Sequence, residues 1–337
     1  MRPTFVQFAA LAFGAAAVLP AAAGTLDQVK ARGQLICGSN PGLAGFALAD
    51  DQGVYKGLDV DECRAIAAAI FNDPSKVKFI PINAKDRPTI LASGEIDVLI
   101  RNTTWTLSRE TGGMFFTGIN FYDGQGFMVR KSLGINSALK LDGASVCVQQ
   151  GTTTELNLAD YFRANTMKLE AVVFATDEEA VKAYDSGRCD AYTTDASGLY
   201  SERLKMSKPD DNIVLPEIIS KEPLGPSVRK DDVDWFQLVQ WTHYALLNAE
   251  EYGVTQANVD QMLKSPNPNI RRLLGIEGDY GKGLGLTNDW AYRIIKAVGN
   301  YGEIFERNVG MGSPIKIARG LNAEWNKGGL QYAPPIR

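Results

Sequence analysis

The sequence predicts an α/β protein made of two lobes, between which the chain crosses twice. Strand and helix patterns alternate as β-α-β-α-β over residues 35–100, and the alternation starts again near residue 143. The two units end alike, in ASGEIDVLIRNTT and in DSGRCDAYTTDAS. Alternating strands and helices favour a largely parallel sheet with helices on both faces. We therefore expect two lobes of similar topology.

The elements of the first unit have clear start and stop signals. Gly33 ends the first helix pattern, Pro88 starts a later one and Gly94 ends it. Apolar residues at helical spacing predict a further helix, which lies between these two in the sequence. The expected helices are 25–33, 59–71 and 87–94, and the expected strands are 35–40, 77–82 and 96–100.

The second unit repeats this order of elements. Short apolar runs bounded by turn residues predict its strands. The expected strands are 144–151, 169–175 and 189–195, and the expected helices lie in 152–165 and 177–187. The rest of the chain has helical segments at 233–253 and 288–310 but no strand-rich unit of its own.

Two extended segments are expected to connect the lobes. GFMVR at residues 126–130 is interpreted as the first crossing strand. The second crossing is expected within residues 219–230, where proline and glycine exclude a helix. Two crossings make the first lobe discontinuous. We expect lobe 1 to contain residues 24–129 and 224–337, and lobe 2 to contain residues 130–223.

Residues 1–23 are typical of a secretory signal peptide. Arg2 precedes an apolar stretch, and Ala21 and Ala23 match the small residues that signal peptidase requires. The apolar stretch is short for a membrane span, so a retained N-terminal anchor is the weaker alternative. We expect cleavage after Ala23 and export of the remaining chain.

Export would place the four cysteines in an oxidising compartment, where disulfides persist. Four cysteines allow three pairings. Cys37 lies near Cys63 in the sequence and Cys147 lies near Cys189, and each pair would fall within one lobe. We favour these two pairs as structural disulfides. A metal site is disfavoured because the chain has no CxxC motif and one histidine.

Composition and motifs argue against several other classes of protein. The net charge is −4 and no dense block of Lys and Arg occurs, which disfavours nucleic-acid binding. The single histidine, His243, lies in an apolar helical pattern, so it is a poor candidate for a catalytic base. The chain has no Walker loop, GxSxG or HExxH motif. We predict no metal and no cofactor.

Polar residues gather at the carboxyl ends of the predicted strands, where open α/β sheets bind ligands. Arg109 can hold a carboxylate through two parallel hydrogen bonds, and Thr104 offers a hydroxyl nearby. The loop QQGTTTE leads into a helix N-terminus, which favours negative charge. Asp195 ends a strand of the second unit and would attract a cation. This combination suits a zwitterionic amino acid.

Plainer interpretations of the same residues stay open. Arg109 can equally be a surface arginine in a turn with Glu110. Asp195 also fits as the N-cap of the helix pattern that follows it. The QQGTTTE loop can serve only as a loop and helix cap.

Four segments together resemble one known family. They are GLDVDECRAIAAAIF, SGEIDVLIRNTTWTLSRE, VQQGTTTE and SGRCDAYTTD. They are similar to segments of the periplasmic substrate-binding proteins of polar amino-acid ABC importers, and most of all of the general L-amino-acid-binding proteins. The resemblance covers essentially the whole chain after the signal peptide. It implies the two-lobed periplasmic binding protein fold of type II, with two crossing hinge segments and a periplasmic location.

The resemblance also assigns binding roles to single residues. Arg109 and Thr104 would bind the α-carboxylate of an amino acid, and a backbone N–H at Thr153 would complete this site. Asp195 would pair with the α-ammonium group, which the backbone at Asn102 would also contact.

Asn40 and Leu43 would line the first ligand loop by the same resemblance. Narrow relatives often carry an aromatic ring at the position of Leu43 and another near Ala84, and a lysine where Gln149 stands. The absence of these rings implies a wider and less specific pocket for the ligand side chain.

We therefore expect a monomeric binding protein that takes L-amino acids with broad specificity and delivers them to the membrane permease of an ABC importer. One alternative is a periplasmic, dehydratase-like enzyme on the same fold, acting on a small carboxylate. Its acid or base would be Asp195 or Glu155. Another alternative, the sensing module of a receptor, is disfavoured because no later membrane span or signalling domain occurs in the sequence.

Overall fold

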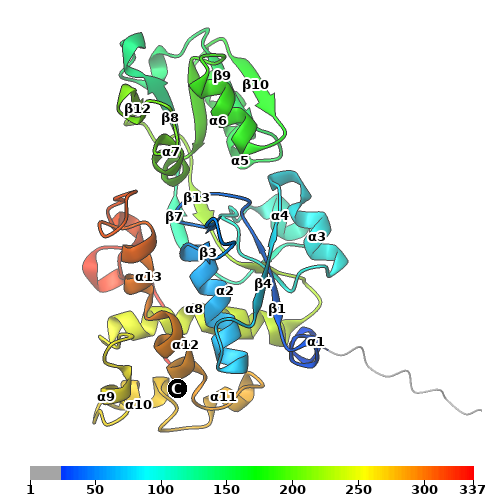
Figure 1. Cartoon of the computed structure of the whole chain (residues 1–337), viewed down its shortest axis with the longest axis vertical. Coiled ribbons are helices and arrows are strands. Elements are labelled where there is room, and N and C mark those ends of the chain that lie inside the picture. Colours follow the sequence, from blue (N-terminus) through cyan, green and yellow to red (C-terminus); the bar gives the residue numbers. More distant parts are fainter. Residues whose placement is uncertain (1–23) are drawn as a thin grey trace, which may run out of the picture.

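A computed structural model describes residues 24–337 as two lobes joined by a narrow connection (Figure 1). The predicted signal peptide, residues 1–23, lies outside the described residues. One lobe contains the green elements at the top of Figure 1, and the other contains the blue, yellow and orange elements below. Within residues 24–337, no helix has the length and apolarity that crossing a membrane requires.

The lower lobe contains a five-stranded sheet in the order β4-β1-β5-β14-β6. β1 (Leu35–Ser39) runs parallel to β4 (Val77–Pro81) and to β5 (Val98–Leu99). β14 (Ser227–Val228) returns from the upper lobe and runs antiparallel to β5 and to β6 (Phe115–Phe116). The carboxyl ends of β1 and β5 consequently lie at the same edge of the sheet.

Helix α2 (Leu58–Phe71) packs on both sides because its apolar positions surround the helix. Cys63 and Ile66 belong to a core that includes β1 and β5, whereas Ala65 and Ala69 face the C-terminal helices. The other early elements of this lobe are α1 (Thr25–Arg32), β2 (Leu48–Ala49), β3 (Tyr55–Lys56), α3 (Arg87–Ser93) and α4 (Leu107–Thr111).

The upper lobe contains a second five-stranded sheet in the order β10-β9-β11-β8-β12. β9 runs parallel to β10 and β11, whereas β8 runs antiparallel to β11 and β12. The elements are β8 (Gln125–Arg130), β9 (Ser145–Gln149), α5 (Thr153–Ala164), β10 (Glu170–Phe174), α6 (Asp177–Asp185), β11 (Ala191–Asp195), α7 (Ala196–Arg203) and β12 (Asn212–Val214).

The first crossing lies earlier than the sequence pattern indicated. β7 (Phe121–Asp123) pairs antiparallel with β13 (Glu222–Leu224), and these two strands connect the lobes. The predicted crossing strand GFMVR is instead part of β8, inside the upper sheet. Its apolar run resembles a crossing because both of its faces are buried. From sheet membership we infer that the first lobe boundary lies near residue 124.

The C-terminal helices pack against α2 and complete the lower lobe (Figure 1). The segment predicted as one helical region, residues 288–310, forms two helices. Gly299, with φ of 78°, follows the first, and the Asn300 side chain accepts a hydrogen bond from Glu303 N to start the second. The helices are α8 (Val233–Glu251), α9 (Val259–Met262), α10 (Pro268–Leu273), α11 (Tyr280–Gly283), α12 (Trp290–Val298) and α13 (Tyr301–Asn308).

Both predicted disulfides are confirmed, Cys37–Cys63 and Cys147–Cys189. The first joins β1 to α2, and the second joins β9 to the segment just before β11. Each bond lies within one lobe and constrains the unfolded chain by closing a loop.

Removing the upper-lobe disulfide should destabilise the protein strongly. Cys147 and Cys189 are 42 residues apart, so the loss of loop closure predicts about 3–4 kcal/mol for the double variant Cys147→Ala/Cys189→Ala. Urea unfolding followed by circular dichroism measures this free energy. An unchanged unfolding midpoint in the double variant would contradict the structural role of the bond.

Candidate ligand-binding site

The strand ends of the two sheets meet around one small pocket. Its volume is about 30 Å³, and both lobes contribute to its wall. All seven residues to which the resemblance assigned ligand contacts line this pocket: Asn40, Leu43, Asn102, Thr104, Arg109, Thr153 and Asp195. The structure therefore brings the predicted residues together, although they come from four separate parts of the chain.

Arg109 faces the pocket from the short helix α4. Thr106 caps this helix by accepting a hydrogen bond from the Arg109 backbone N–H at 3.2 Å. The Arg109 Nη1 donates to the Thr104 carbonyl oxygen at 2.8 Å. Among residues 24–337, Nε and Nη2 have no hydrogen-bond partner, so part of the guanidinium is available to an anion. Burial lowers the pKa of Arg109, while Glu222 and Asp195 oppose this effect.

Asp195 presents an unpaired carboxylate to the same pocket. Its side chain is 7% exposed and, within the described part of the chain, takes part in no hydrogen bond. Burial, followed by the charges of Asp123 and Glu222, raises its pKa well above the usual value, while Arg109 opposes the shift. A cationic group is what this carboxylate lacks.

Asp195 has the N-cap position of α7 that the alternative predicted, but its side chain does not cap the helix. The Asp123 carboxylate takes that role, accepting from the Ser197 backbone N–H at 3.4 Å and from the Ser197 hydroxyl. The Asp195 side chain is thereby free to face the pocket.

Asn102 has an unusual backbone conformation that its neighbours hold in place. Its φ is 33°, which is rare for a residue with a side chain. Its backbone N–H donates to Asp59 Oδ2 at 2.8 Å, and its side-chain oxygen accepts from Asn40 Nδ2 at 2.9 Å. Burial, together with the nearby Glu62, raises the pKa of Asp59 to about 7. The first ligand loop and the β5 loop are thus tied together.

Glu222 is a site residue that the sequence analysis missed. It lies on the crossing strand β13, is 1% exposed, and accepts hydrogen bonds from both lobes. Its Oε2 accepts from the Thr104 hydroxyl at 2.6 Å and from the Thr153 hydroxyl at 2.7 Å. Its Oε1 accepts from Asn157 and Ser220 at 2.7 Å each. The sequence feature that could have revealed it is a carboxylate within the predicted crossing segment, at KEPLGP.

Further bonds between the lobes show that this arrangement is closed. From α7, the Ser201 hydroxyl donates to the Ala44 carbonyl oxygen at 2.9 Å. Lys205 Nζ donates to the Gly42 carbonyl oxygen at 2.6 Å. These contacts join the first ligand loop of the lower lobe directly to the upper lobe.

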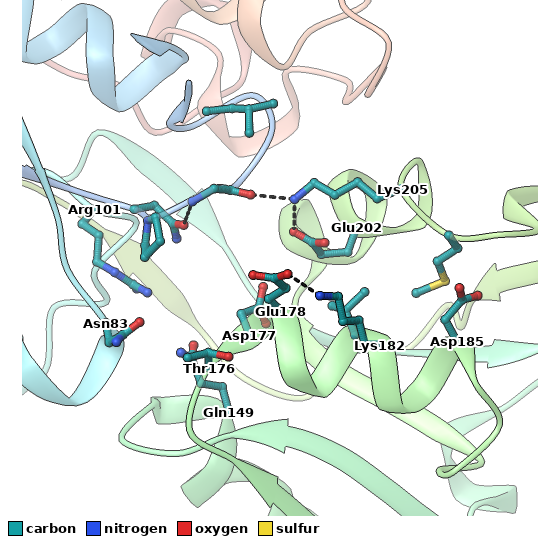
Figure 2. Close-up of a pocket in the computed structure, with 16 residues that line it drawn as sticks. Asn83, Arg101, Gln149, Thr176, Asp177, Glu178, Lys182, Asp185, Glu202 and Lys205 are labelled. Carbon is teal, nitrogen blue, oxygen red and sulfur yellow. Dashed lines mark hydrogen bonds and ion pairs between the residues drawn. The ribbon is translucent and has the colours of Figure 1, made fainter. Parts of the chain in front are cut away.

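A larger cavity of about 450 Å³ adjoins the small pocket (Figure 2). Four residues line both spaces: Asn40, Arg101, Gln149 and Asp177. Beyond them the wall carries charged side chains from α6 and α7, several of which pair with each other in Figure 2. The two spaces together can hold a small zwitterion with a long polar side chain.

The histidine and possible metal ligands lie outside this arrangement. His243 is buried in α8, with Nδ1 3.1 Å from Glu62 Oε1, and lines neither cavity. Residues 24–337 contain no group of three or more His, Cys, Asp or Glu side chains placed to hold a metal ion. The residues that line the small pocket offer charged groups and hydrogen-bond donors and acceptors.

Comparison with known proteins identifies the family. Residues 35–258 match the model of the bacterial extracellular solute-binding proteins, family 3. The chain is 63% identical over 332 residues to the general L-amino acid-binding periplasmic protein AapJ of Rhizobium johnstonii, covering 98% of this chain and 96% of that one. It is 58% identical over 334 residues to the glutamate/glutamine/aspartate/asparagine-binding protein BztA of Rhodobacter capsulatus, covering 98% and 97%.

A solved structure agrees with these relatives. It is a periplasmic binding protein of an ABC transporter from Brucella ovis with glutathione bound, 66% identical to this chain, with a TM-score of 0.92 over 94% of this chain and 100% of that one. The predicted two-lobed fold and the predicted family are both confirmed. The chain belongs to the bacterial extracellular solute-binding proteins of family 3, and it is a periplasmic substrate-binding protein of that family.

Proposed function

We propose that this protein binds L-amino acids in the periplasm and delivers them to the permease of an ABC importer. The observation that carries the proposal is one pocket in which, among residues 24–337, an arginine has free donors and an aspartate has no hydrogen-bond partner. These two groups match the carboxylate and the ammonium group of an amino acid. The names of the relatives support the same ligand class.

The residues divide the work of binding between the lobes. Arg109 would hold the carboxylate from the lower lobe, and the N-terminus of α5 at Thr153 would complete this contact. Thr104 would support this contact through its carbonyl oxygen, which accepts from Arg109, because its hydroxyl donates to Glu222. Asp195 would hold the ammonium group from the upper lobe, together with the backbone at Asn102. Because a bound ligand contacts both lobes, it favours the closed form, which the permease would recognise.

Broad specificity follows from the walls of the pocket. Leu43 and Ala84 are buried aliphatic residues and place no aromatic ring against a ligand side chain. The adjoining cavity of about 450 Å³ leaves room for side chains of different lengths. The relative AapJ is named as a general L-amino acid-binding protein, which supports this breadth.

A second ligand class is γ-glutamyl peptides. The neighbour from Brucella ovis is described with glutathione bound. Glutathione carries an α-carboxylate and an α-ammonium group on its glutamyl residue, so the small pocket could receive that end. The larger cavity would then receive the rest of the peptide.

We further propose that the protein acts as a monomer, binds no nucleic acid and is not an enzyme. Of the two candidate acids or bases, Glu155 does not line either cavity, and its carboxylate accepts from the Gly151 backbone N–H at 2.8 Å. Asp195 is explained as the ammonium partner. Recovery of an unchanged ligand after prolonged incubation, checked by mass spectrometry, supports this proposal, whereas product formation favours the dehydratase-like alternative.

Calorimetry on refolded, ligand-stripped protein tests the proposed ligand class. We expect many L-amino acids to bind, and their D-isomers and 2-hydroxy acid analogues to bind at least about tenfold more weakly, because the hydroxy acids lack the ammonium group that Asp195 would pair with. Binding of a single amino acid would contradict the broad pocket. No response to any amino acid or to glutathione would contradict the proposed function.

A further inference from the structure

The passage between the small pocket and the larger cavity is lined by polar side chains. An amino acid whose head group lies between Arg109 and Asp195 must direct its side chain through this passage, because the same four residues line both spaces. The polar groups of the passage can therefore reach the ligand side chain. Two of its residues, Arg101 and Gln149, are buried, and their end groups have no hydrogen-bond partner within residues 24–337.

Arg101 directs its guanidinium into this passage, as Figure 2 shows. Its side chain comes from the loop after β5, and its Nε donates to the Ile82 carbonyl oxygen at 2.8 Å. The residue is 4% exposed, yet its two terminal nitrogens have no hydrogen-bond or ion-pair partner among residues 24–337. Burial lowers the pKa of Arg101 to about 10, so the guanidinium is still charged at neutral pH.

Gln149 and Asn83 line the same cavity as this guanidinium (Figure 2). Gln149 ends β9 and is 7% exposed, and its side-chain amide has no partner in the described part of the chain. Asn83 comes from the loop after β4, and its side-chain amide is likewise unpaired within residues 24–337. Side-chain amides from both lobes thus line the same cavity as the guanidinium, together with the Asp177 carboxylate, whose charge also acts on Arg101.

The other cations of the cavity are already paired. Lys182 Nζ is 2.5 Å from Glu178 Oε1 on the same helix. Lys205 Nζ is 2.9 Å from Glu202 Oε1 and 2.6 Å from the Gly42 carbonyl oxygen. Arg101 is therefore the cation of this cavity that has no carboxylate within ion-pair distance among the described residues.

We infer that Arg101, supported by Gln149 and Asn83, determines ligand preference by binding an oxygen at the end of the ligand side chain. This inference rests on the proposed function, since it places the ligand head group between Arg109 and Asp195. Glutamate- and glutamine-type side chains carry such an oxygen. A side chain of equal length without an oxygen leaves the buried guanidinium without a partner, which weakens binding.

Isothermal titration calorimetry with three ligands tests this role. L-glutamate and L-glutamine carry the oxygen, and L-methionine has a similar length without it. In the wild-type protein we expect the first two to bind about 10-fold to 100-fold more tightly than L-methionine, as for hydrogen bonds to a charged group. In Arg101→Met this difference should fall to within about threefold, with the affinity for L-methionine nearly unchanged.

Arg130→Met is the matched control, because it removes the same charge outside both cavities. Arg130 donates to the Tyr184 and Cys189 carbonyl oxygens at 3.1 and 2.8 Å, away from the ligand passage. This variant should keep the wild-type order of affinities. A second variant, Gln149→Leu, should reduce the preference for L-glutamine in the same direction as Arg101→Met.

The outcomes separate this inference from the proposed function. If L-methionine binds the wild-type protein as tightly as L-glutamine does, the role of Arg101 is refuted and the amino-acid-binding function stands. The role of Arg101 is also refuted, and the amino-acid-binding function stands, if Arg101→Met weakens the binding of all three ligands equally. If no amino acid binds the wild-type protein, the proposed function itself fails. If Arg101→Met does not fold, the wild-type ratio and Gln149→Leu decide the question.

Discussion

Arg109→Ala should reduce the affinity for every L-amino acid by about 100-fold to 10,000-fold, because it removes two hydrogen bonds to a carboxylate, each worth about 1.5–3 kcal/mol. The loss should be the same for different side chains, since all amino acids share this carboxylate. Calorimetric titration of the variant with a strong and a weak ligand measures the loss of affinity and shows whether the loss is the same for both ligands.

The folded state should tolerate this substitution. The Arg109 side chain makes one hydrogen bond within residues 24–337, to the Thr104 carbonyl oxygen. The thermal midpoint of the ligand-free variant should therefore stay close to that of the wild type. Arg109→Lys is the control for charge alone, because lysine cannot form two parallel hydrogen bonds, and it should bind with intermediate affinity. Affinity within tenfold of wild type in Arg109→Ala would refute the carboxylate role.

Asp195→Asn should weaken amino-acid binding by about 100-fold, because it removes the charge that faces the ligand ammonium group while keeping the shape of the side chain. The unpaired and buried position of this carboxylate makes the expected effect large. 2-Hydroxy acids lack the ammonium group, so their weaker binding should change little in the variant. Equal losses for amino acids and hydroxy acids would contradict the pairing.

The same carboxylate predicts how affinity depends on pH. In the ligand-free protein the pKa of Asp195 is raised well above its usual value, chiefly by burial. A bound ammonium group stabilises the ionised form and lowers this pKa, so binding releases a proton. Affinity should rise with pH from the ordinary Asp value of about 3.9 up to the raised value. Titrations in buffers with different ionisation enthalpies measure the released proton, which should be absent in Asp195→Asn.

Most of the fold could be predicted because local signals and global topology agree. Gly33 and Gly94 end helices where expected, both in the left-handed conformation that glycine tolerates. The crossing strand was misplaced because β8 is buried on both faces and its sequence does not distinguish a hinge from a sheet interior. The break at Gly299 was missed because apolar residues continue at helical spacing on either side of it.

The site was predictable to the extent that it depends on residues at the strand ends. Asp195 ends the core strand β11, and Arg109 lies in the short helix that follows the polar loop after β5, so both charges are visible in the sequence beyond core strands. Glu222 and Arg101 were not assigned because their roles depend on which groups surround them in the folded protein. Glu222 receives its partners from two lobes, and Arg101 is distinguished by the partners that it lacks.

The hydrogen bonds of Glu222 make closure partly independent of what is bound. Thr104 and Thr153, from opposite lobes, donate to the same oxygen of a carboxylate on the crossing strand. These bonds stabilise the closed form by the same amount whatever the side chain of the ligand is. A ligand then has to contribute only the remaining difference between the open and closed states. Tolerance toward many side chains is in this sense a property of the hinge as much as of the pocket wall.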